Sequence, residues 1–373
     1  MKVDHSQLLL IVAQSGRHLA QAAVREGFTV RVADCFADID TLAISEQYLQ
    51  LPSFNALTPA DWLQAIIRLS SHQPCTLICG TGIERFYPQL AQLPANIHFA
   101  GPAVSSFSAL CDPRQWQALL DELKLPSPPT RFSPPQTEPA TWLIKQAASW
   151  GGTHIGTAQA ATHSVASYYQ QKIAGRSASV LFLANGGSAH TLLLNEQFPR
   201  APEHNDFCLQ GISNELQLTL PQRNFLDNAL QQLTRRLALQ GMMSLDFIIT
   251  DDARIYLLEI NPRPTASAQL LDDNFQLISS HCTAVNGGLP PVSCELSAVK
   301  KLLWFCFAPE DIVIPAAFRW PEYCHDLPAD GHTVRQGEVI CSIVLSSVVN
   351  NSIDHNTGHQ YANKLLQHLR QSA

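Results

Sequence analysis

The sequence of 373 residues is poor in charge, since only 15% of its residues are Asp, Glu, Lys or Arg, and its formal net charge is −7. It has no basic run, and neutralising nucleic-acid phosphates takes clustered lysine and arginine, so we expect no nucleic-acid partner. No apolar run reaches the length of a membrane span, so we expect no membrane association. The polar and acidic start, Met1 to His5, does not have the pattern of a secretory signal, which favours a cytoplasmic location.

Several familiar motifs are also missing. The ten cysteines lack C-x-x-C spacing, so they are expected to be buried thiols in a reducing cytosol, without a disulfide or metal framework. His355 and His359 are four residues apart but lie among Asn, Gly and Asp, which favours solvated histidines in a loop or frayed helix. The first turn, residues 13–17, lacks G-x-G-x-x-G, which argues against a dinucleotide-binding domain.

The first pattern along the chain is an alternation of strand and helix signals over residues 6–110. Buried strands near residues 8–12 and 29–33 flank an alanine-rich helix, and further strand patterns follow at 75–80 and 97–101. Repeated βα units predict a parallel sheet with helices on both faces. A proline-rich linker follows the helix at 114–123, so we predict an α/β domain at 1–110, a chemical domain with α+β character at 111–299, and a small β-rich unit at 300–373.

The most informative stretch is residues 244–267, which reads as two strands joined by the polar turn 251–254. A hairpin with this turn places Asp246 near Glu259 and Asn261, and the last two share a face because they are two residues apart in a strand. Three oxygen-bearing side chains then converge beside Arg263. This set suits Mg²⁺ bridging nucleotide phosphates, with the remaining ligands from phosphate and water. The alternative is an edge hairpin with solvated acids.

A second constellation lies about a hundred residues upstream. Lys145 ends an apolar strand, where it can reach an α- or β-phosphate, and a glycine-containing loop follows that can close over phosphate oxygens. The loop contains Gly151, Gly152, Thr153 and Gly156. A connector between two later strands can offer hydrogen-bonding groups to an adenine edge; it contains Gln170, Gln171, Lys172 and Ile173. Taken alone, each segment also fits an ordinary hairpin, and the loop is not a P-loop, because G-x-x-x-x-G-K-[ST] is absent.

The chain resembles the ATP-grasp superfamily of ATP-dependent carboxylate–amine ligases in the order of four features. These are the open α/β domain, the lysine and glycine loop, the connector, and the E-x-N-x-R ending at 259–263. The resemblance implies an ATP-grasp fold, with ATP clamped between two subdomains. It implies Asp246, Glu259 and Asn261 as ligands of Mg²⁺, with Mn²⁺ as the alternative metal. Lys145 and Arg263 are then the catalytic residues, and the loop and connector bind the nucleotide.

Within that superfamily, segments 15–17, 33–41, 261–267 and 326–331 resemble a group of predicted ATP-dependent carboligases. Relatives of that group occur with genes for one-carbon carriers of the methanopterin and methanofuran type. The resemblance therefore implies an amide-forming ligase, for example one that uses glutamate, in biosynthesis of such a cofactor. It implies a small-molecule carboxylate and an amine as partners, and a homodimer, since family members are often dimers.

The sequence departs from the family pattern at a few positions. Asp112 is followed by Pro113 where many members have lysine, and the connector has Gln171 and Lys172 where an acidic residue is usual. These changes leave two alternatives to the ligase: a carboxylase-type acyl-phosphate enzyme on the same fold, and a non-catalytic nucleotide-binding regulator. His281, on a helix after the hairpin, is expected to pack beneath it; lining the substrate side is the alternative.

Overall fold

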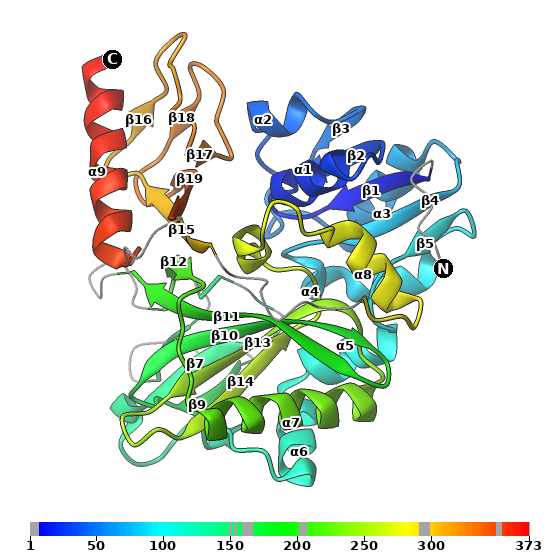
Figure 1. The fold of residues 1–373 in the computed structure, drawn as a ribbon, viewed down its shortest axis with the longest axis vertical. Helices are drawn as coiled ribbons and strands as arrows, with labels where there is room; N and C mark the ends of the chain where they lie inside the picture. The colour runs from blue at the N-terminus through cyan, green and yellow to red at the C-terminus, as the bar shows by residue number, and fades with distance from the viewer. Residues whose placement is uncertain are drawn as a thin grey trace.

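The computed structural model of the chain describes residues 7–147, 149, 151–152, 155–158, 167–200, 207–290, 299–347 and 353–372. The chain runs from an N-terminal α/β part, coloured blue in Figure 1, through a green and yellow middle to an orange and red C-terminal part. In the described ranges no helix is both long enough and apolar enough to cross a membrane.

The N-terminal part is a parallel sheet, as the alternating pattern predicts, and its strand order is β3-β2-β1-β4-β5. The strands are β1 (Leu8–Val12), β2 (Val30–Asp34), β3 (Gln47–Gln50), β4 (Cys75–Cys79) and β5 (Ile97–Phe99). The helices are α1 (Arg17–Arg25), α2 (Ile39–Leu42), α3 (Pro59–Ser70), α4 (Ile83–Phe86), the 3-10 helix η1 (Tyr87–Gln92) and α5 (Val104–Cys111). All residues of β1, β2 and β4 are buried, since α1 and α3 pack on opposite faces of the sheet.

A small antiparallel sheet follows, with the strand order β6-β9-β7-β8. Its elements, together with the helices beside it, are α6 (Pro113–Leu123), β6 (Thr130–Arg131), the 3-10 helix η2 (Pro139–Thr141), β7 (Trp142–Gln146), β8 (Gly156–Thr157) and β9 (Ser167–Gln171). Asp112 caps α6, because its Oδ1 accepts hydrogen bonds from the backbone N–H of Arg114 at 2.8 Å and of Gln115 at 3.4 Å. The Asp112-Pro113 step thus starts a helix, and the Arg114 guanidinium lies 4.1 Å from the ring centre of Phe132.

The large sheet has the order β14-β13-β10-β11-β12-β15-β19-β17. Its strands are β10 (Arg176–Asn185), β11 (Ala189–Pro199), β12 (Leu209–Ser213), β13 (Gln240–Ile249), β14 (Ile255–Asn261), β15 (Lys300–Phe307), β17 (Cys324–His325) and β19 (Val339–Ser347). The remaining elements are α7 (Leu220–Leu237), the 3-10 helix η4 (Ala266–Leu270), α8 (Leu277–Val285), β16 (Ile312–Val313), β18 (Thr333–Val334) and α9 (His355–Ser372). Because β12 pairs with β15, the sheet continues without a break into the C-terminal part.

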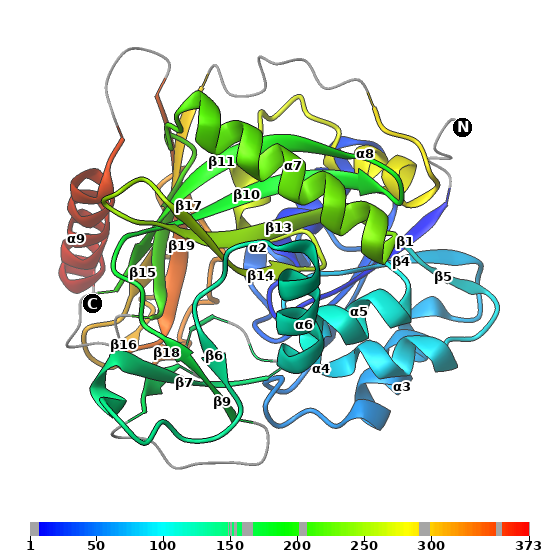
Figure 2. The same cartoon turned by 90° about the horizontal axis from the view of Figure 1, so that it is seen from below.

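Both faces of this large sheet are buried. In β10, Val180 and Phe182 pack with residues of α7, whereas Leu181 and Leu183 pack with residues of α8 and α1. Neighbouring side chains of a strand point to opposite faces, so a continuous apolar run is what two covered faces require. Figure 2 shows α7 lying along one face of the sheet, and Figure 1 shows α1 and α8 on the opposite side of the sheet from α7.

The C-terminal helix differs from the sequence expectation. The pattern predicts a helix over 360–371, but α9 begins at His355, because Asp354 accepts a hydrogen bond from the N–H of Thr357 at 3.0 Å. His355 and His359 therefore lie on the first turns of a helix, which is one of the two placements expected from the sequence, and both are exposed as expected. The ring of His359 meets the ring of Trp304 edge-on, with 4.8 Å between centroids.

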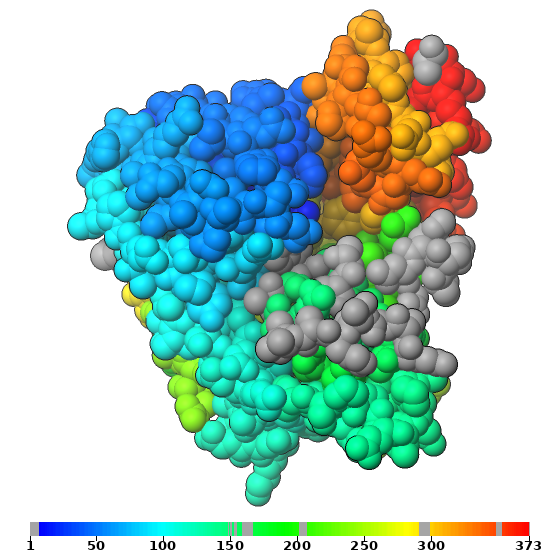
Figure 3. Space-filling view, turned by 180° about the vertical axis from the view of Figure 1, so that it is seen from behind, coloured from blue at the N-terminus to red at the C-terminus, as the bar shows by residue number. Residues whose placement is uncertain are grey.

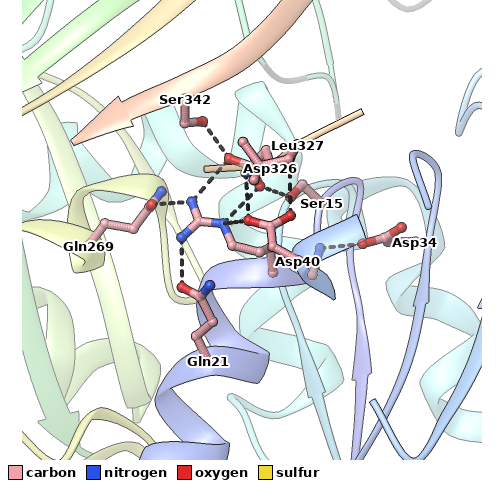
Figure 4. A network of polar contacts seen from close by, with 10 residues as sticks. Ser15, Gln21, Asp34, Asp40, Gln269, Asp326, Leu327 and Ser342 are labelled. Carbon is pink, nitrogen blue, oxygen red and sulfur yellow. Dashed lines mark hydrogen bonds and ion pairs between the residues drawn. The ribbon is translucent and has the colours of Figure 1, made fainter. Parts of the chain in front are cut away.

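A buried polar network joins the N-terminal and C-terminal parts (Figure 4). Arg17 Nη2 lies 3.0 Å from Asp326 Oδ2, and the same carboxylate accepts hydrogen bonds from Ser15 at 2.8 Å and Ser342 at 2.5 Å. The Asp40 carboxylate accepts from the backbone N–H of Asp326 at 3.0 Å. Seen from behind, the two parts lie side by side above the green middle of the chain (Figure 3), and this network joins them.

Candidate functional site

The predicted hairpin is present, and it brings its polar residues together. Asp246 on β13 stands opposite Glu259 on β14, and Asn261 Nδ2 donates to Asp246 Oδ2 at 3.2 Å. Gln197 on β11, which belongs to no recognisable motif, donates to Asp246 Oδ1 at 3.3 Å. Burial, followed by the nearby Glu259 carboxylate, raises the pKa of Asp246 to about 7.

A β-bulge in this hairpin controls which side chains face the site. Asp246 pairs with Glu259 but Phe247 pairs with Leu257, so Leu258 is an extra residue on β14. The insertion lets Leu257 and Ile260 both enter the same hydrophobic core, although they are three residues apart. Glu259 thereby stands opposite Asp246 while Leu257 and Ile260 remain in the core, and Leu258 lines the cleft described below.

Arg263 lies just past the hairpin and is buried. Its Nη2 donates to Asn261 Oδ1 at 3.1 Å, and its Nε donates to Glu84 Oε1 at 2.5 Å. Glu84 belongs to α4 and is itself buried, and its other oxygen accepts from the N–H of Gly82 at 3.0 Å. Gly82 has a φ of +102°, and a Cβ there would clash with the ring of Phe54, so glycine is required at this turn.

Lys145 on β7 is buried and its Nζ donates to Gln170 Oε1 on β9 at 2.8 Å. Burial lowers the pKa of Lys145, and the carboxylates of Glu259 and Asp246 act in the opposite direction. The ammonium group is thus in the electrostatic range of the hairpin, a hundred residues away in the chain. The two constellations found in the sequence are brought to one place.

The glycine loop is described in part. Gly151 and Gly152 have φ angles of +72° and +76°, and a Cβ on Gly152 would clash with the backbone oxygen of Phe207, so both conformations favour glycine. Gly156 lies in β8, where it pairs with Ile144. Thr153, also expected to bind nucleotide, lies outside the described residues.

In the connector, the side chain of Gln170 faces the site, whereas the backbone N–H groups of Gln171 and Lys172 form hydrogen bonds with neighbouring segments. The N–H of Gln171 donates to Pro129 O at 2.9 Å, and the N–H of Lys172 donates to Thr141 O at 2.8 Å. The Lys172 ammonium lies 5.3 Å from the ring centre of Phe207. Ile173 follows the end of β9 and precedes β10.

A cleft lies between the small sheet, the hairpin strand β14 and the helices α5 and α6. Polar residues from both sheets line it, among them Gln146, Tyr168, Gln170, Glu259 and Asn261. Its apolar wall consists of Leu110, Pro113, Trp116, Leu120, Leu258 and Ile260. Within the described ranges no group of three or more His, Cys, Asp or Glu side chains could hold a metal ion. The polar centre of the hairpin is thus two carboxylates with one amide.

Two residues of this cleft were not predicted from the sequence, for different reasons. Glu84 follows the glycine-rich end of β4, at the edge where parallel strands of an α/β sheet place functional loops, and that position was the available signal. Trp116 gave no signal beyond an apolar helix position, and its Nε1 donates to Leu258 O at 2.8 Å.

His281 has the structural role expected for it. Its Nδ1 accepts from the N–H of Met242 at 2.9 Å, so the neutral ring carries its proton on Nε2, which lies 2.9 Å from Ala100 O. Burial lowers the pKa of His281 to about 4. The ring therefore joins β13 to the N-terminal part, beneath the hairpin.

The ATP-grasp fold is defined by three features together. These are an N-terminal parallel α/β sheet, a small antiparallel sheet that faces a larger sheet across a cleft, and paired carboxylates at the end of a hairpin. Residues 112–267 match the family model described as the ATP-grasp domain. The chain therefore has the ATP-grasp fold, as the motif order predicts. No curated protein matches the sequence.

Solved structures with this fold extend over nearly the whole chain. An L-amino acid ligase from Bacillus licheniformis has a TM-score of 0.69 and 13% identity, covering 98% of this chain and 98% of that one. A biotin carboxylase from Campylobacter jejuni, in complex with β,γ-ATP, has a TM-score of 0.70 and 15% identity, covering 96% and 91%. The biotin carboxylase domain dimer of the Hydrogenobacter thermophilus 2-oxoglutarate carboxylase, with MgADP and bicarbonate, has a TM-score of 0.71 and 12% identity, covering 96% and 89%.

Proposed function

We propose that this protein is an ATP-dependent carboxylate–amine ligase, which forms an amide through an acyl phosphate and releases ADP and phosphate. The observation that carries the proposal is the meeting of two distant constellations: Lys145 with Gln170 on one sheet, and Asp246 with Glu259 on the other. Gln170, the hydrogen-bond partner of Lys145, lines the cleft together with Glu259, so a phosphate chain with its metal ion would lie close to both constellations.

The nucleotide would lie along this cleft. Lys145 would hold the α- and β-phosphates, exchanging its bond with Gln170 for phosphate oxygens that compensate its buried charge better. Gly151, Gly152, Thr153 and Gly156 would cover the phosphates. The connector residues Gln170, Gln171, Lys172 and Ile173 would lie beside the base, with the apolar wall around Trp116 for its ring.

The residues of the hairpin fit a magnesium ion. Two carboxylates stand opposite each other on paired strands, and their repulsion contributes to the raised pKa of Asp246, so a divalent cation would relieve an existing electrostatic conflict. Asp246, Glu259 and the amide oxygen of Asn261 are hard oxygen donors of the kind that Mg²⁺ prefers, and Mn²⁺ is the alternative. When bound, the ion would neutralise phosphate charge.

In the proposed reaction a carboxylate oxygen of the acid attacks the γ-phosphorus of ATP, and the bond to the bridging oxygen of ADP breaks. The amine then attacks the acyl carbon, phosphate leaves with the bonding pair, and the amine loses a proton as the amide forms. Arg263 would stabilise negative charge on the transferred phosphoryl group and on the tetrahedral oxyanion. Its bonds to Glu84 and Asn261 orient the guanidinium before substrates arrive.

A narrower proposal concerns the pathway. The segments that resemble the predicted carboligases of one-carbon carrier biosynthesis are far apart in the sequence, yet Ser15, Arg17, Asp40 and Asp326 belong to one polar network (Figure 4). These contacts show that the distant segments form one part of the structure. The narrower proposal is an amino-acid ligase, for example one that joins glutamate, in biosynthesis of such a carrier, acting as a homodimer; the resemblance of these segments to the predicted carboligases supports it.

Carboxylation is the second candidate, because two of the solved structures that share the fold are biotin carboxylases, one of them with bicarbonate. Bicarbonate would then take the place of the organic acid in the same phosphoryl transfer.

The test is a screen for ADP release with MgATP, varying carboxylic acids and amines independently and including bicarbonate, amino acids, and pterin and furan carriers. The ligase proposal expects ADP only with an acid–amine pair, and a product mass equal to the sum of the pair minus water. ADP with bicarbonate and a carboxylated product would favour the second candidate. Binding of MgATP without turnover in any combination would favour a non-catalytic regulator.

A further inference from the structure

A second cavity, of about 250 Å³, lies away from the nucleotide cleft, between three parts of the chain. Its walls come from α1, from residues 268–277 after the hairpin, and from strands β15, β17 and β19. Among the described residues that line it, none is Asp246, Glu259, Asn261 or Arg263. A molecule in this cavity would therefore be held apart from the phosphoryl-transfer chemistry.

Two of the cations that line the cavity are already satisfied by the protein. Arg17 pairs with Asp326 at 3.0 Å, and Lys301 lies 2.9 Å from Asp273 and donates to Leu271 O at 2.7 Å. Both cations are buried. The charge of each is therefore already compensated by a carboxylate of the protein.

One charge of each sign remains. Arg25, at the exposed end of α1, and Asp272, which is half-buried, both line the cavity, and neither side chain has an ion pair or hydrogen bond within the described part of the chain. His18 and His325 are also in the lining, but burial lowers the pKa of each, so both rings are neutral near pH 7. The unpaired charges are thus one guanidinium and one carboxylate, and the neutral His18 ring adds a buried Nε2 that has no hydrogen-bond partner within the described residues. One charge of each sign matches a zwitterion better than a multiply charged anion.

The rest of the wall is partly polar and partly apolar. Its polar residues are Gln21, Gln269 and Ser346, and its apolar part consists of Ala268, Leu271, Phe275, Leu277 and Val344. A concave site with an apolar wall and a few convergent polar groups is the usual form of a small-molecule site. Its volume suits a compound the size of a free amino acid.

We infer that this cavity binds a free α-amino acid with an apolar side chain, its carboxylate held by Arg25, its ammonium group by Asp272, and its side chain against the apolar wall. Because the walls belong to the N-terminal, middle and C-terminal parts, the bound amino acid holds these parts together. The inference does not depend on the proposed ligase reaction, since the ligand is not consumed at this site.

The test is isothermal titration of the full-length, nucleotide-free protein with L-leucine. The same titration is run with isoamylamine, which is leucine without its carboxylate, and with 4-methylpentanoate, which is leucine without its amine. Arg25→Gln and Asp272→Asn are the test variants. Arg68→Gln and Asp251→Asn are their matched controls, since both residues are exposed and line neither the cavity nor the cleft.

We expect saturable binding of L-leucine, with at least about tenfold weaker binding of each single-charge analogue and of each test variant. The control variants, and Glu259→Gln in the nucleotide site, should bind leucine like the wild type. No saturable binding of leucine, equal binding of either analogue, or binding that Arg25→Gln and Asp272→Asn leave unchanged would overturn the inference. Circular dichroism of the two test variants would show that their folds are retained, as expected for substitutions of one exposed and one half-buried side chain.

Discussion

Nε of Arg263 donates to Oε1 of Glu84 at 2.5 Å, and both side chains are buried. The arginine that follows the hairpin is thereby joined to a helix of the N-terminal part, 179 residues earlier. This pair connects the frame of the protein with the end of the hairpin that the proposed chemistry uses.

Replacing Glu84 with Gln should lower the free energy of unfolding by about 3–5 kcal/mol, because it leaves the buried guanidinium of Arg263 without its carboxylate. Urea denaturation would measure the change. Glu138→Gln is the control, since Glu138 is exposed, and it should differ from the wild type by less than about 0.5 kcal/mol. A cost below 1 kcal/mol for Glu84→Gln would show that the pair does not hold Arg263 in place.

Glu259→Gln keeps the shape of the side chain but removes half of the paired carboxylate charge. We expect the rate of ADP release to fall by roughly 100-fold or more, because the site loses a fixed charge at the phosphate chain. Thermal stabilisation by MgATP should fall with it. Near-normal turnover in this variant would contradict the assignment of the hairpin, whereas loss of turnover in Glu138→Gln would point to a general defect.

Lys145→Met should separate stability from function. The buried ammonium group is costly, as its lowered pKa indicates, so an apolar side chain of similar length should leave the ligand-free protein within about 1 kcal/mol of the wild type or more stable. Calorimetric titration should nevertheless show at least about tenfold weaker binding of MgATP. Lys364→Met, on the exposed face of α9, is the control, and equal affinity of both variants for MgATP would contradict the role of Lys145.

Asp326→Asn should have a stability cost that depends on pH. Burial alone would raise the pKa of Asp326, but the Arg17 guanidinium and the hydrogen bonds from Ser342 and Ser15 hold it well below the ordinary value of 3.8. A carboxylate with a depressed folded-state pKa stabilises the protein above its unfolded-state pKa, and this stabilisation is lost as the pH falls towards the folded-state pKa. The difference between wild type and variant should therefore be constant from pH 7 to pH 5 and shrink below about pH 4.

Urea denaturation at pH 7, 5 and 3.5 would measure this difference, which we expect to be about 3–5 kcal/mol at the two higher values. Asp251→Asn, at an exposed turn, should show no such dependence. A difference that grows as the pH falls would contradict the ion pair with Arg17.

Much of this architecture could be predicted from local patterns. The parallel N-terminal sheet with helices on both faces follows from repeated βα units, and the meeting of Asp246 with Glu259 follows from a short polar turn between two apolar strands. The packing role of His281 also followed from its place on an apolar helix. These features depend on residues close together in the sequence.

The rest depends on contacts that no local pattern records. The bulge at Leu258 is a matter of strand register, and the pairs Arg263–Glu84 and Arg17–Asp326 join residues more than 170 positions apart. The early start of α9 depends on a cap by Asp354, which the loop-like composition around it concealed. The continuation of the large sheet through β15 and β19 is likewise a result of long-range pairing.

The most direct test of the central claim follows the oxygen atoms. The protein is incubated with MgATP, the amine and the carboxylic acid found by the ADP-release screen, the acid carrying ¹⁸O in its carboxylate, and the phosphate products are analysed by mass spectrometry. An acyl-phosphate mechanism at the Asp246–Glu259 hairpin predicts one ¹⁸O in the inorganic phosphate released with ADP, and no transfer in Glu259→Gln. Unlabelled phosphate, or ¹⁸O in AMP released with pyrophosphate, would contradict it.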